Sequence, residues 1–408
     1  MADMKRLGYA IMAGVATMGT ALSGEKIPDG TRRETPAYTI VNDYVRQSVD
    51  AKGSWFQPRP TAFPTKSGIP AAIMTVQRAL PGASDYFSGF SVTASTDYGK
   101  TWTAPKEQAE LGWRQHDNGI TEGICDFTLG YHAKTGKVLA IGHSTRYRGN
   151  KLAYKTHGRD VMYSVYDPAT KIWQLPRRLV LGEADTYFLA GTHGQWLAEP
   201  DGSLLIPVYY TNRKAAAAFL LKGVVARCAF DGEELKVAEL GKPLVHPVKR
   251  GLYEKSITFF QNRYYLTMRN DQKGYVAVSD DGLNYTPHTP WTFDDGADLG
   301  SYNTQQKWVT HGDALYLVYT RRGADNDHIM RHRAPLFMAK VDPTHLCVLR
   351  ATEQIVVPER GRALGNFDAT TVDAKETWIT VGGSKPAAGF HLTRIIWKTP
   401  NALAGRVN

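Results

Sequence analysis

The chain has 408 residues and a formal net charge of +10, from 49 Lys and Arg against 39 Asp and Glu. Charged residues make up only 22%, which excludes a coiled coil or a disordered chain. The 38 Gly, 21 Pro and 21 Tyr favour a β-rich globular protein. Cys125, Cys228 and Cys347 lie far apart and form no C-x-x-C pair, so we expect buried thiols and neither a zinc ribbon nor a disulfide framework.

The N-terminus has the three-part layout of an export signal. Met4-Lys5-Arg6 is positively charged, residues 7–22 form an apolar run, and small residues surround Ser23. This pattern predicts a signal peptide over residues 1–23, in which residues 1–3 are possible extra start residues, and a mature chain from Gly24. The alternative is a membrane anchor. We therefore expect a secreted or periplasmic protein with no membrane span in the mature chain.

Strand-like segments recur along the chain, most of them beside a turn that contains Gly, Asp or Asn. Examples are residues 71–77, 137–143, 203–210, 263–269, 314–319 and 377–381. Helical periodicity is rare, and residues 214–221 are the best candidate for a helix. The pattern predicts an all-β fold.

One short motif is well defined. Residues 95–102 read S-x-D-x-G-x-T-W, which resembles the Asp-box of sialidases and related β-propellers. Weaker copies lie at 166–173, 230–232, 279–285 and 341–343. In that family the motif is a hairpin between the outer two strands of a blade. Together with the strand near Trp397, the intervals of ~50–70 residues imply six four-stranded antiparallel blades, with seven as the alternative. We expect one propeller domain over residues 24–408.

The order of charged residues is also similar to that of sialidases. Arg59 stands just before Pro60, and Asp85 lies ten residues before Ser95. Glu254 precedes a strand that ends at Arg269, and a further motif copy follows. Arg333 fits the strand that carries the third arginine of the family, and Arg331 is the alternative.

The resemblance implies a role for each of these residues. Arg59, Arg269 and Arg333 would bind one sugar carboxylate, because converging guanidinium groups select such an anion. Asp85 would be the acid/base, and Glu254 would activate a tyrosine nucleophile. The final blade should supply that tyrosine, but Phe367 stands near the expected place. Tyr302, from a different blade, is the candidate substitute.

A second resemblance is to uronate polysaccharide lyases of the ulvan and rhamnose–glucuronate types. It implies proton abstraction by His143 with Tyr209 or Tyr210, and Arg227 would neutralise the acid. A third possibility is a non-catalytic, lectin-like propeller. All three hypotheses share an acidic oligo- or polysaccharide partner. The scattered basic residues and the lack of a nucleic-acid motif argue against nucleic acid.

No His or Cys spacing indicates a metal site, and we expect no cofactor. A structural calcium ion held by loop oxygens is left open. The leading sequence hypothesis is thus an exported exo-glycoside hydrolase of sialidase type that acts on acidic glycans.

Overall fold

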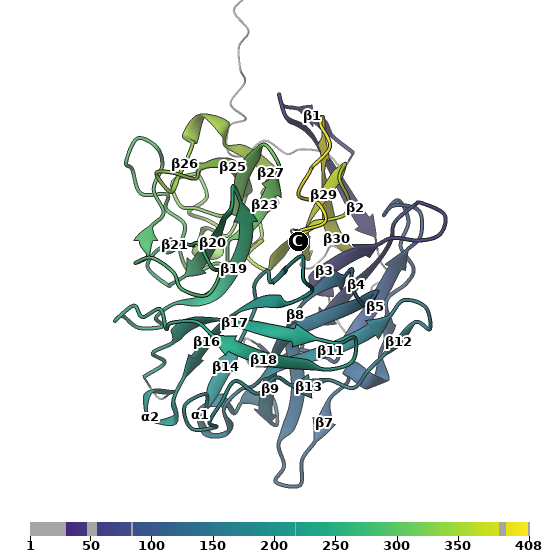
Figure 1. Cartoon of the computed structure of the whole chain (residues 1–408), viewed down its shortest axis with the longest axis vertical. Helices are drawn as coiled ribbons and strands as arrows, with labels where there is room; N and C mark the ends of the chain where they lie inside the picture. Colours follow the sequence, from purple (N-terminus) through teal and green to yellow (C-terminus); the bar gives the residue numbers. More distant parts are fainter. Residues whose placement is uncertain (1–29, 47–54, 83–84, 217, 383–388, 407–408) are drawn as a thin grey trace, which may run out of the picture.

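The computed structural model describes residues 30–46, 55–82, 85–216, 218–382 and 389–406. The strands in these ranges form six antiparallel sheets that follow one another around the molecule (Figure 1). Five sheets are built from strands consecutive in the sequence, and one combines both ends of the chain. The predicted signal peptide lies outside the described residues. Within the described ranges, no helix is long and apolar enough to cross a membrane.

The first three sheets occupy the chain up to residue 240. The first contains β3 (Trp55–Phe63), β4 (Ala71–Arg78), β5 (Ser91–Ser95) and β6 (Lys106–Glu107). The second contains β7 (Arg114–Gln115), β8 (Thr121–His132), β9 (Lys137–Arg148), β10 (Lys151–Leu152), β11 (Val161–Asp167), β12 (Ile172–Trp173) and β13 (Arg177–Arg178). The third contains β14 (Leu189–Gly191), β15 (Leu197–Ala198), β16 (Leu204–Thr211), β17 (Lys222–Phe230) and β18 (Leu235–Leu240).

The other three sheets complete the ring. The fourth contains β19 (Tyr253–Phe260), β20 (Arg263–Arg269), β21 (Gly274–Ser279) and β22 (Thr289–Pro290). The fifth contains β23 (Lys307–His311), β24 (Ala314–Tyr319), β25 (Leu336–Asp342), β26 (Cys347–Val348) and β27 (Gln354–Val357). The closing sheet contains β1 (Arg32–Glu34), β2 (Tyr38–Arg46), β28 (Phe367–Thr371), β29 (Glu376–Gly382) and β30 (Gly389–Trp397).

This arrangement confirms the predicted all-β propeller. The predicted four strands per blade are found in two sheets only, since three sheets have five strands and one has seven. Every strand of the described residues belongs to one of these six sheets, so none remains to form a seventh. The helix predicted over 214–221 is also wrong, because α2 covers only Arg213–Ala216. The other helical segments are α1 (Tyr154–His157) and the 3₁₀ turns Ala109–Leu111, Met330–His332 and Arg350–Thr352.

The hydrophobic core is divided among the gaps between neighbouring sheets. One cluster packs β9 and β11 of the second sheet against β16 and β17 of the third. Similar clusters lie between the third and fourth, fourth and fifth, and fifth and closing sheets. Each sheet therefore buries both faces, which explains strands such as β4 and β16 that are buried along their whole length. Cys125, Cys228 and Cys347 are buried free thiols, as expected.

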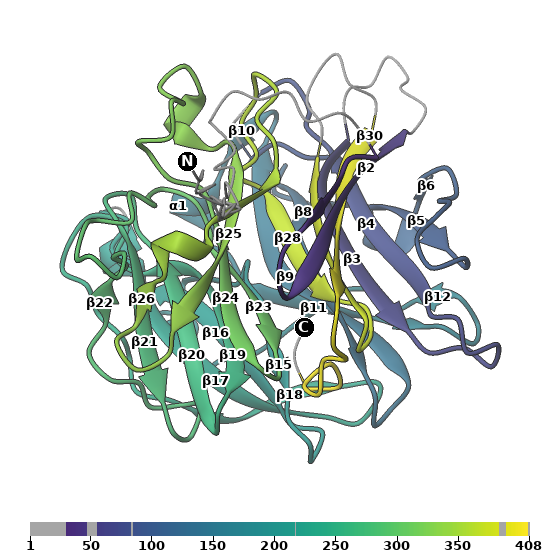
Figure 2. The same cartoon turned by 90° about the horizontal axis from the view of Figure 1, so that it is seen from above.

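The ring is closed by pairing the two ends of the chain. All nine residues of β2 pair with β30 in antiparallel register, from Tyr38 opposite Trp397 to Arg46 opposite Gly389. Figure 2 shows these two strands side by side, in the purple and yellow of the chain ends. Ile40 lies opposite Ile395 in this ladder, and both are fully buried. Closure protects two strand edges that would otherwise be open.

The residues 95–102 form the predicted hairpin turn between β5 and β6. The Gly99 amide donates to the Ser95 hydroxyl at 2.8 Å, and the Thr101 amide donates to Asp97 at 2.9 Å. Gly99 has a φ of 72°, which a side chain would make unfavourable. The Trp102 indole donates back to the Gly99 carbonyl at 3.1 Å. The turn is therefore held by its own polar side chains, and it carries no catalytic group.

Ile40→Ala should lower the free energy of unfolding by roughly 2–5 kcal/mol, because it leaves a cavity beside the closing ladder. Ile172→Ala, on the outer strand β12 at a side chain that is 60% exposed, should change stability by less than about 0.5 kcal/mol. Chemical denaturation measures both. Equal effects of the two substitutions would contradict the role of β2 in closing the ring.

Candidate active site

The innermost strand of each sheet faces the propeller axis. Contacts pass directly between β28 and β3, β3 and β8, β19 and β23, and β23 and β28. At one end of these strands lies a cavity of about 420 Å³, a size typical of small-molecule sites. Five arginines line it, namely Arg159, Arg250, Arg269, Arg331 and Arg333. Three carboxylates accompany them, namely Asp85, Asp126 and Glu254. The excess of positive charge favours an anionic ligand.

Three innermost strands reach the cavity through the same local distortion. The register of β3, β8 and β19 shifts at Phe56/Arg59, Cys125/Thr128 and Tyr253/Ser256. Inside each shift one residue other than glycine has a positive φ: 50° at Gln57, 57° at Asp126 and 44° at Glu254. All three of these side chains line the cavity. Bulges re-aim side chains, and such backbone costs about 1–3 kcal/mol per residue, so the repetition marks a functional site.

One wall of the cavity holds two arginines close together. Arg269 forms an ion pair with Glu254, and its Nη2 donates to Asn303 Oδ1 at 2.5 Å. Arg333 donates to the Thr304 hydroxyl at 2.8 Å and to the Asn303 carbonyl at 2.5 Å. Burial and the charge of Arg269 lower the pKa of Arg333 to about 10. An anion bound at this wall would relieve that repulsion.

Glu254 remains a carboxylate in this wall. Burial, the largest single influence, would raise its pKa, but Arg269 and His193 together outweigh burial and the pKa lies below its ordinary value. Arg269 also lies over the Tyr253 ring, 4.5 Å from its centroid, while Arg250 donates to the Tyr253 hydroxyl at 2.5 Å. The wall thus presents a carboxylate, two guanidinium groups that are both anchored to the segment at Asn303 and Thr304 or to Glu254, and a tyrosine held in place.

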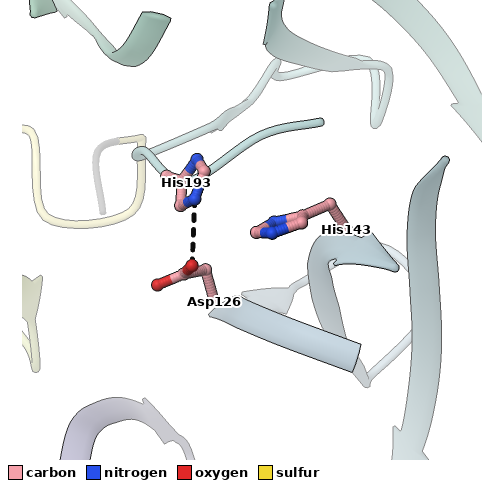
Figure 3. Close-up of side chains that lie close together, drawn as sticks. All are labelled: Asp126, His143 and His193. Carbon is pink, nitrogen blue, oxygen red and sulfur yellow. Dashed lines mark ion pairs between the residues drawn. The ribbon is translucent and has the colours of Figure 1, made fainter. Parts of the chain in front are cut away.

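The opposite wall holds Asp126 and His193. The Nε2 of His193 lies 2.9 Å from Asp126 Oδ2, and the His143 ring points toward this pair from one side (Figure 3). The His193 ring stacks on Tyr209 with centroids 5.4 Å apart. Burial raises the pKa of Asp126, but His193, His143 and Arg59 together outweigh burial, and the pKa falls well below its ordinary range. Burial is also the main cause that holds the pKa of Tyr209 above its ordinary value, against the lowering effect of Arg159.

A buried ionic network lies beneath the cavity. Arg59, which is 1% exposed, lies 3.4 Å from Asp368 and 3.7 Å from Asp126. Lys307 lies 2.9 Å from Asp368 and donates to the His193 carbonyl at 3.3 Å. Burial lowers the pKa of Lys307 to about 8. These ion pairs fix the positions of Asp126 and of the His193 backbone from below.

The structure brings most of the predicted site residues together. Asp85, Glu254, Arg269, Arg331, Arg333 and Tyr209 all line the cavity. Asp85 lies at the rim with its side chain 48% exposed, 3.5 Å from Arg159. Phe367 is fully buried, and the neighbouring Asn366 lines the cavity.

Other predicted residues lie elsewhere. Arg59 is beneath the cavity, because the bulge in β3 turns Gln57 toward the axis in its place. Tyr302 is outside the lining, with its hydroxyl 2.6 Å from His332 Nδ1. His143 lies behind His193 and is also outside the lining. The two remaining lyase candidates point away: Tyr210 packs on Tyr187, and Arg227 donates to the Asp281 carbonyl at 2.9 Å.

Sequence reasoning missed several lining residues. Gln57, Asp126, Arg159, His193 and Arg250 were assigned no role, although all reach the cavity. They come from the strands of two sheets and from loops before or after other strands, and their spacing along the chain carries no motif. The expectation of no metal site also rested on spacing. The structure places Asp126, His143 and His193 with one possible ligand atom each within 4.8 Å of one another.

Comparisons with known proteins agree with this architecture. No family model and no curated protein matches the sequence. A solved protein of unknown function from Dyadobacter fermentans is 17% identical with a TM-score of 0.61, and the match covers 88% of this chain and 99% of that one. A Hadza microbial sialidase is 14% identical with a TM-score of 0.62, over 87% of this chain and 68% of that one. The fold is that of the sialidase-like β-propellers.

A third sialidase-like propeller extends the comparison. Trypanosoma rangeli sialidase in complex with sialic acid is 14% identical with a TM-score of 0.56, over 91% of this chain and 59% of that one. At these identities the likeness concerns the fold alone. The chain is therefore a sialidase-like propeller whose cavity must be interpreted from its own residues.

Stability should depend on pH through Lys255, which is buried beside Glu254 and donates to the Val208 and Leu252 carbonyls. Burial lowers its pKa from 10.5 to about 7. Between these values the unfolded chain binds more protons, so stability rises with pH across this window. In Lys255→Met, the rise in Tm from about pH 6 to about pH 9 should be smaller than in the wild type. The exposed control Lys66→Met should leave the rise unchanged.

Proposed function

We propose that this protein is a carbohydrate-active enzyme that binds the carboxylate of an acidic sugar in the axial cavity and hydrolyses the adjoining glycosidic bond. The observation that carries the proposal is the pair Arg269 and Arg333, held side by side with the pKa of Arg333 lowered to about 10. Guanidinium groups bind carboxylates through paired, charge-assisted hydrogen bonds. The sialidase-like fold supports a glycan as the carrier of that carboxylate.

The carboxylates of the cavity supply the acid and the base. Asp85, at the open rim, would protonate the departing glycosidic oxygen. Glu254, held ionised by Arg269, would activate a water molecule. Phe367 is buried and cannot be a nucleophile, and Tyr302 lies outside the cavity. We therefore propose direct displacement by water, without a covalent tyrosine intermediate from the closing sheet.

A second candidate is β-elimination of a uronate polysaccharide. It is favoured by Tyr209, His193 and Arg159, which line one wall together. Tyr209 and His193 would exchange protons with the sugar, while the arginines neutralise its carboxylate. These residues replace His143 and Arg227 of the sequence hypothesis. A lectin-like propeller with the same pocket is the non-catalytic alternative.

Arg333→Ala should weaken binding of an acidic sugar about 10- to 150-fold, the loss of a charged hydrogen bond worth roughly 1.5–3 kcal/mol. Calorimetric titration with sialic acid and glucuronic acid measures this. Arg333 is the better choice for substitution than Arg269, because removal of Arg269 would leave Glu254 buried without its partner. The control Arg227→Ala, on β17 and hydrogen-bonded to the Asp281 carbonyl, should bind as the wild type does. Equal affinity in all three proteins would refute the carboxylate site.

The reaction products separate the candidates. A hydrolase releases a reducing sugar without ultraviolet absorbance, whereas a lyase produces an unsaturated uronate that absorbs. With a hydrolase, Asp85→Asn should lower kcat about 10²- to 10⁴-fold, and Tyr209→Phe should have a smaller effect. The reverse order, together with ultraviolet absorbance, would establish the lyase. Binding without either product across a panel of acidic glycans would establish the lectin.

A further inference from the structure

Asp126, His143 and His193 form a compact cluster at the wall of the cavity. Asp126 and His193 lie at 8% exposure and His143 at 1%. The three residues come from β8, β9 and the segment that follows β14, so two sheets must dock before they meet. Figure 3 shows the His143 ring pointing toward the Asp126–His193 pair. Two imidazoles and one carboxylate are a common ligand set for zinc.

We propose that this cluster binds a divalent transition-metal ion, zinc being the best match to its ligands. One possible ligand atom from each residue lies within 4.8 Å of the others. Ligands at about 2.0–2.2 Å from a tetrahedral zinc ion lie about 3.4 Å apart. His193 Nε2 and Asp126 Oδ2 are 2.9 Å apart, so they need to separate only slightly to reach the distance between two zinc ligands. The ligand atom of His143 lies within 4.8 Å of the other two, so its ring must move inward to complete the set.

The pairing of the three residues suits a metal. The Nδ1 atom of His143 is buried and has no hydrogen-bond partner among the described residues, so this nitrogen is available as a ligand. Asp126 turns Oδ2 toward His193, while its Oδ1 lies 3.7 Å from Arg59. The carboxylate can therefore bind a metal through one oxygen.

Arg59, which faces Asp126 Oδ1, has other partners besides this carboxylate. Arg59 is shared with Asp368 at 3.4 Å and donates to the Phe367 carbonyl at 2.5 Å. It therefore does not depend on Asp126 alone for a partner. Because Asp126 and His193 both line the cavity, the remaining coordination position would face it. That position would receive water or an oxygen of the bound sugar, which is the arrangement of a catalytic rather than a structural zinc.

This inference goes beyond the proposed function and does not depend on which reaction occurs. A bound metal would occupy the His193 nitrogen that faces Asp126, so His193 would then be a ligand and not a free base. The metal is measured without substrate, so failure of the metal site and failure of the glycan reaction are distinguishable.

The test uses the full chain, stripped with a chelator, loaded with zinc and freed of excess ion. Elemental analysis should find about one zinc ion per chain in the wild type. Asp126→Asn and His143→Gln should each lower this at least about tenfold. The matched control is His246→Gln. His246 belongs to another histidine pair, with its Nδ1 3.1 Å from His288 Nε2, and this variant should bind zinc as the wild type does.

Cobalt binding by the wild-type chain is a second measurement, and it tests the proposal even if the variants do not fold. Cobalt added to the stripped wild type should give the visible absorbance of a tetrahedral N/O site, and zinc should displace it. Uptake below about 0.1 zinc per wild-type chain would overturn the proposal. Equal uptake in folded His143→Gln and wild type, or loss of uptake in His246→Gln instead, would do the same.

Discussion

The ladder between β2 and β30 is the constraint on which the rest of the structure depends. Nine residue pairs join a strand from the start of the described chain to its last long strand. Each sheet buries both faces against its neighbours, so an open ring would expose apolar surface on two sheets at once. Closure also brings β28 against β3 and β23, which completes the wall of the axial cavity. Stability and the site therefore arise from the same pairing.

Within the closed ring, the site is produced by distortion of otherwise regular strands. In a regular strand, alternate side chains point into the sheets on either side, and few would face the axis. The bulges at Gln57, Asp126 and Glu254 rotate one polar side chain per strand into the cavity. The strain is sustained by fixed partners: Arg269 holds Glu254, and His193 holds Asp126. The charged side chains of the cavity therefore already have protein partners before any ligand binds.

Three residues that the sequence pattern singled out lie in one wall of this cavity, and the roles predicted for them stay predictions. Glu254, Arg269 and Arg333 lie in a linear order that resembles sialidases, and they do meet. Arg59 fitted the same order, but the bulge two residues earlier turns it beneath the cavity. The sequence pattern did not predict the residues of the other wall. His193 lies in a segment between short strands, and its partner Asp126 is 67 residues earlier on another sheet.

The sequence by itself determined the propeller, because turn motifs and strand patterning are local and repeat along the chain. It also singled out Arg269, Arg331 and Arg333, which the structure places in the cavity lining. Only the tertiary structure decided which polar side chains share the cavity, because a one-residue bulge moves a side chain from one face of a strand to another. The cluster of Asp126, His143 and His193 belongs to this second kind. It exists only because neighbouring sheets dock, and no spacing along the chain encodes that contact.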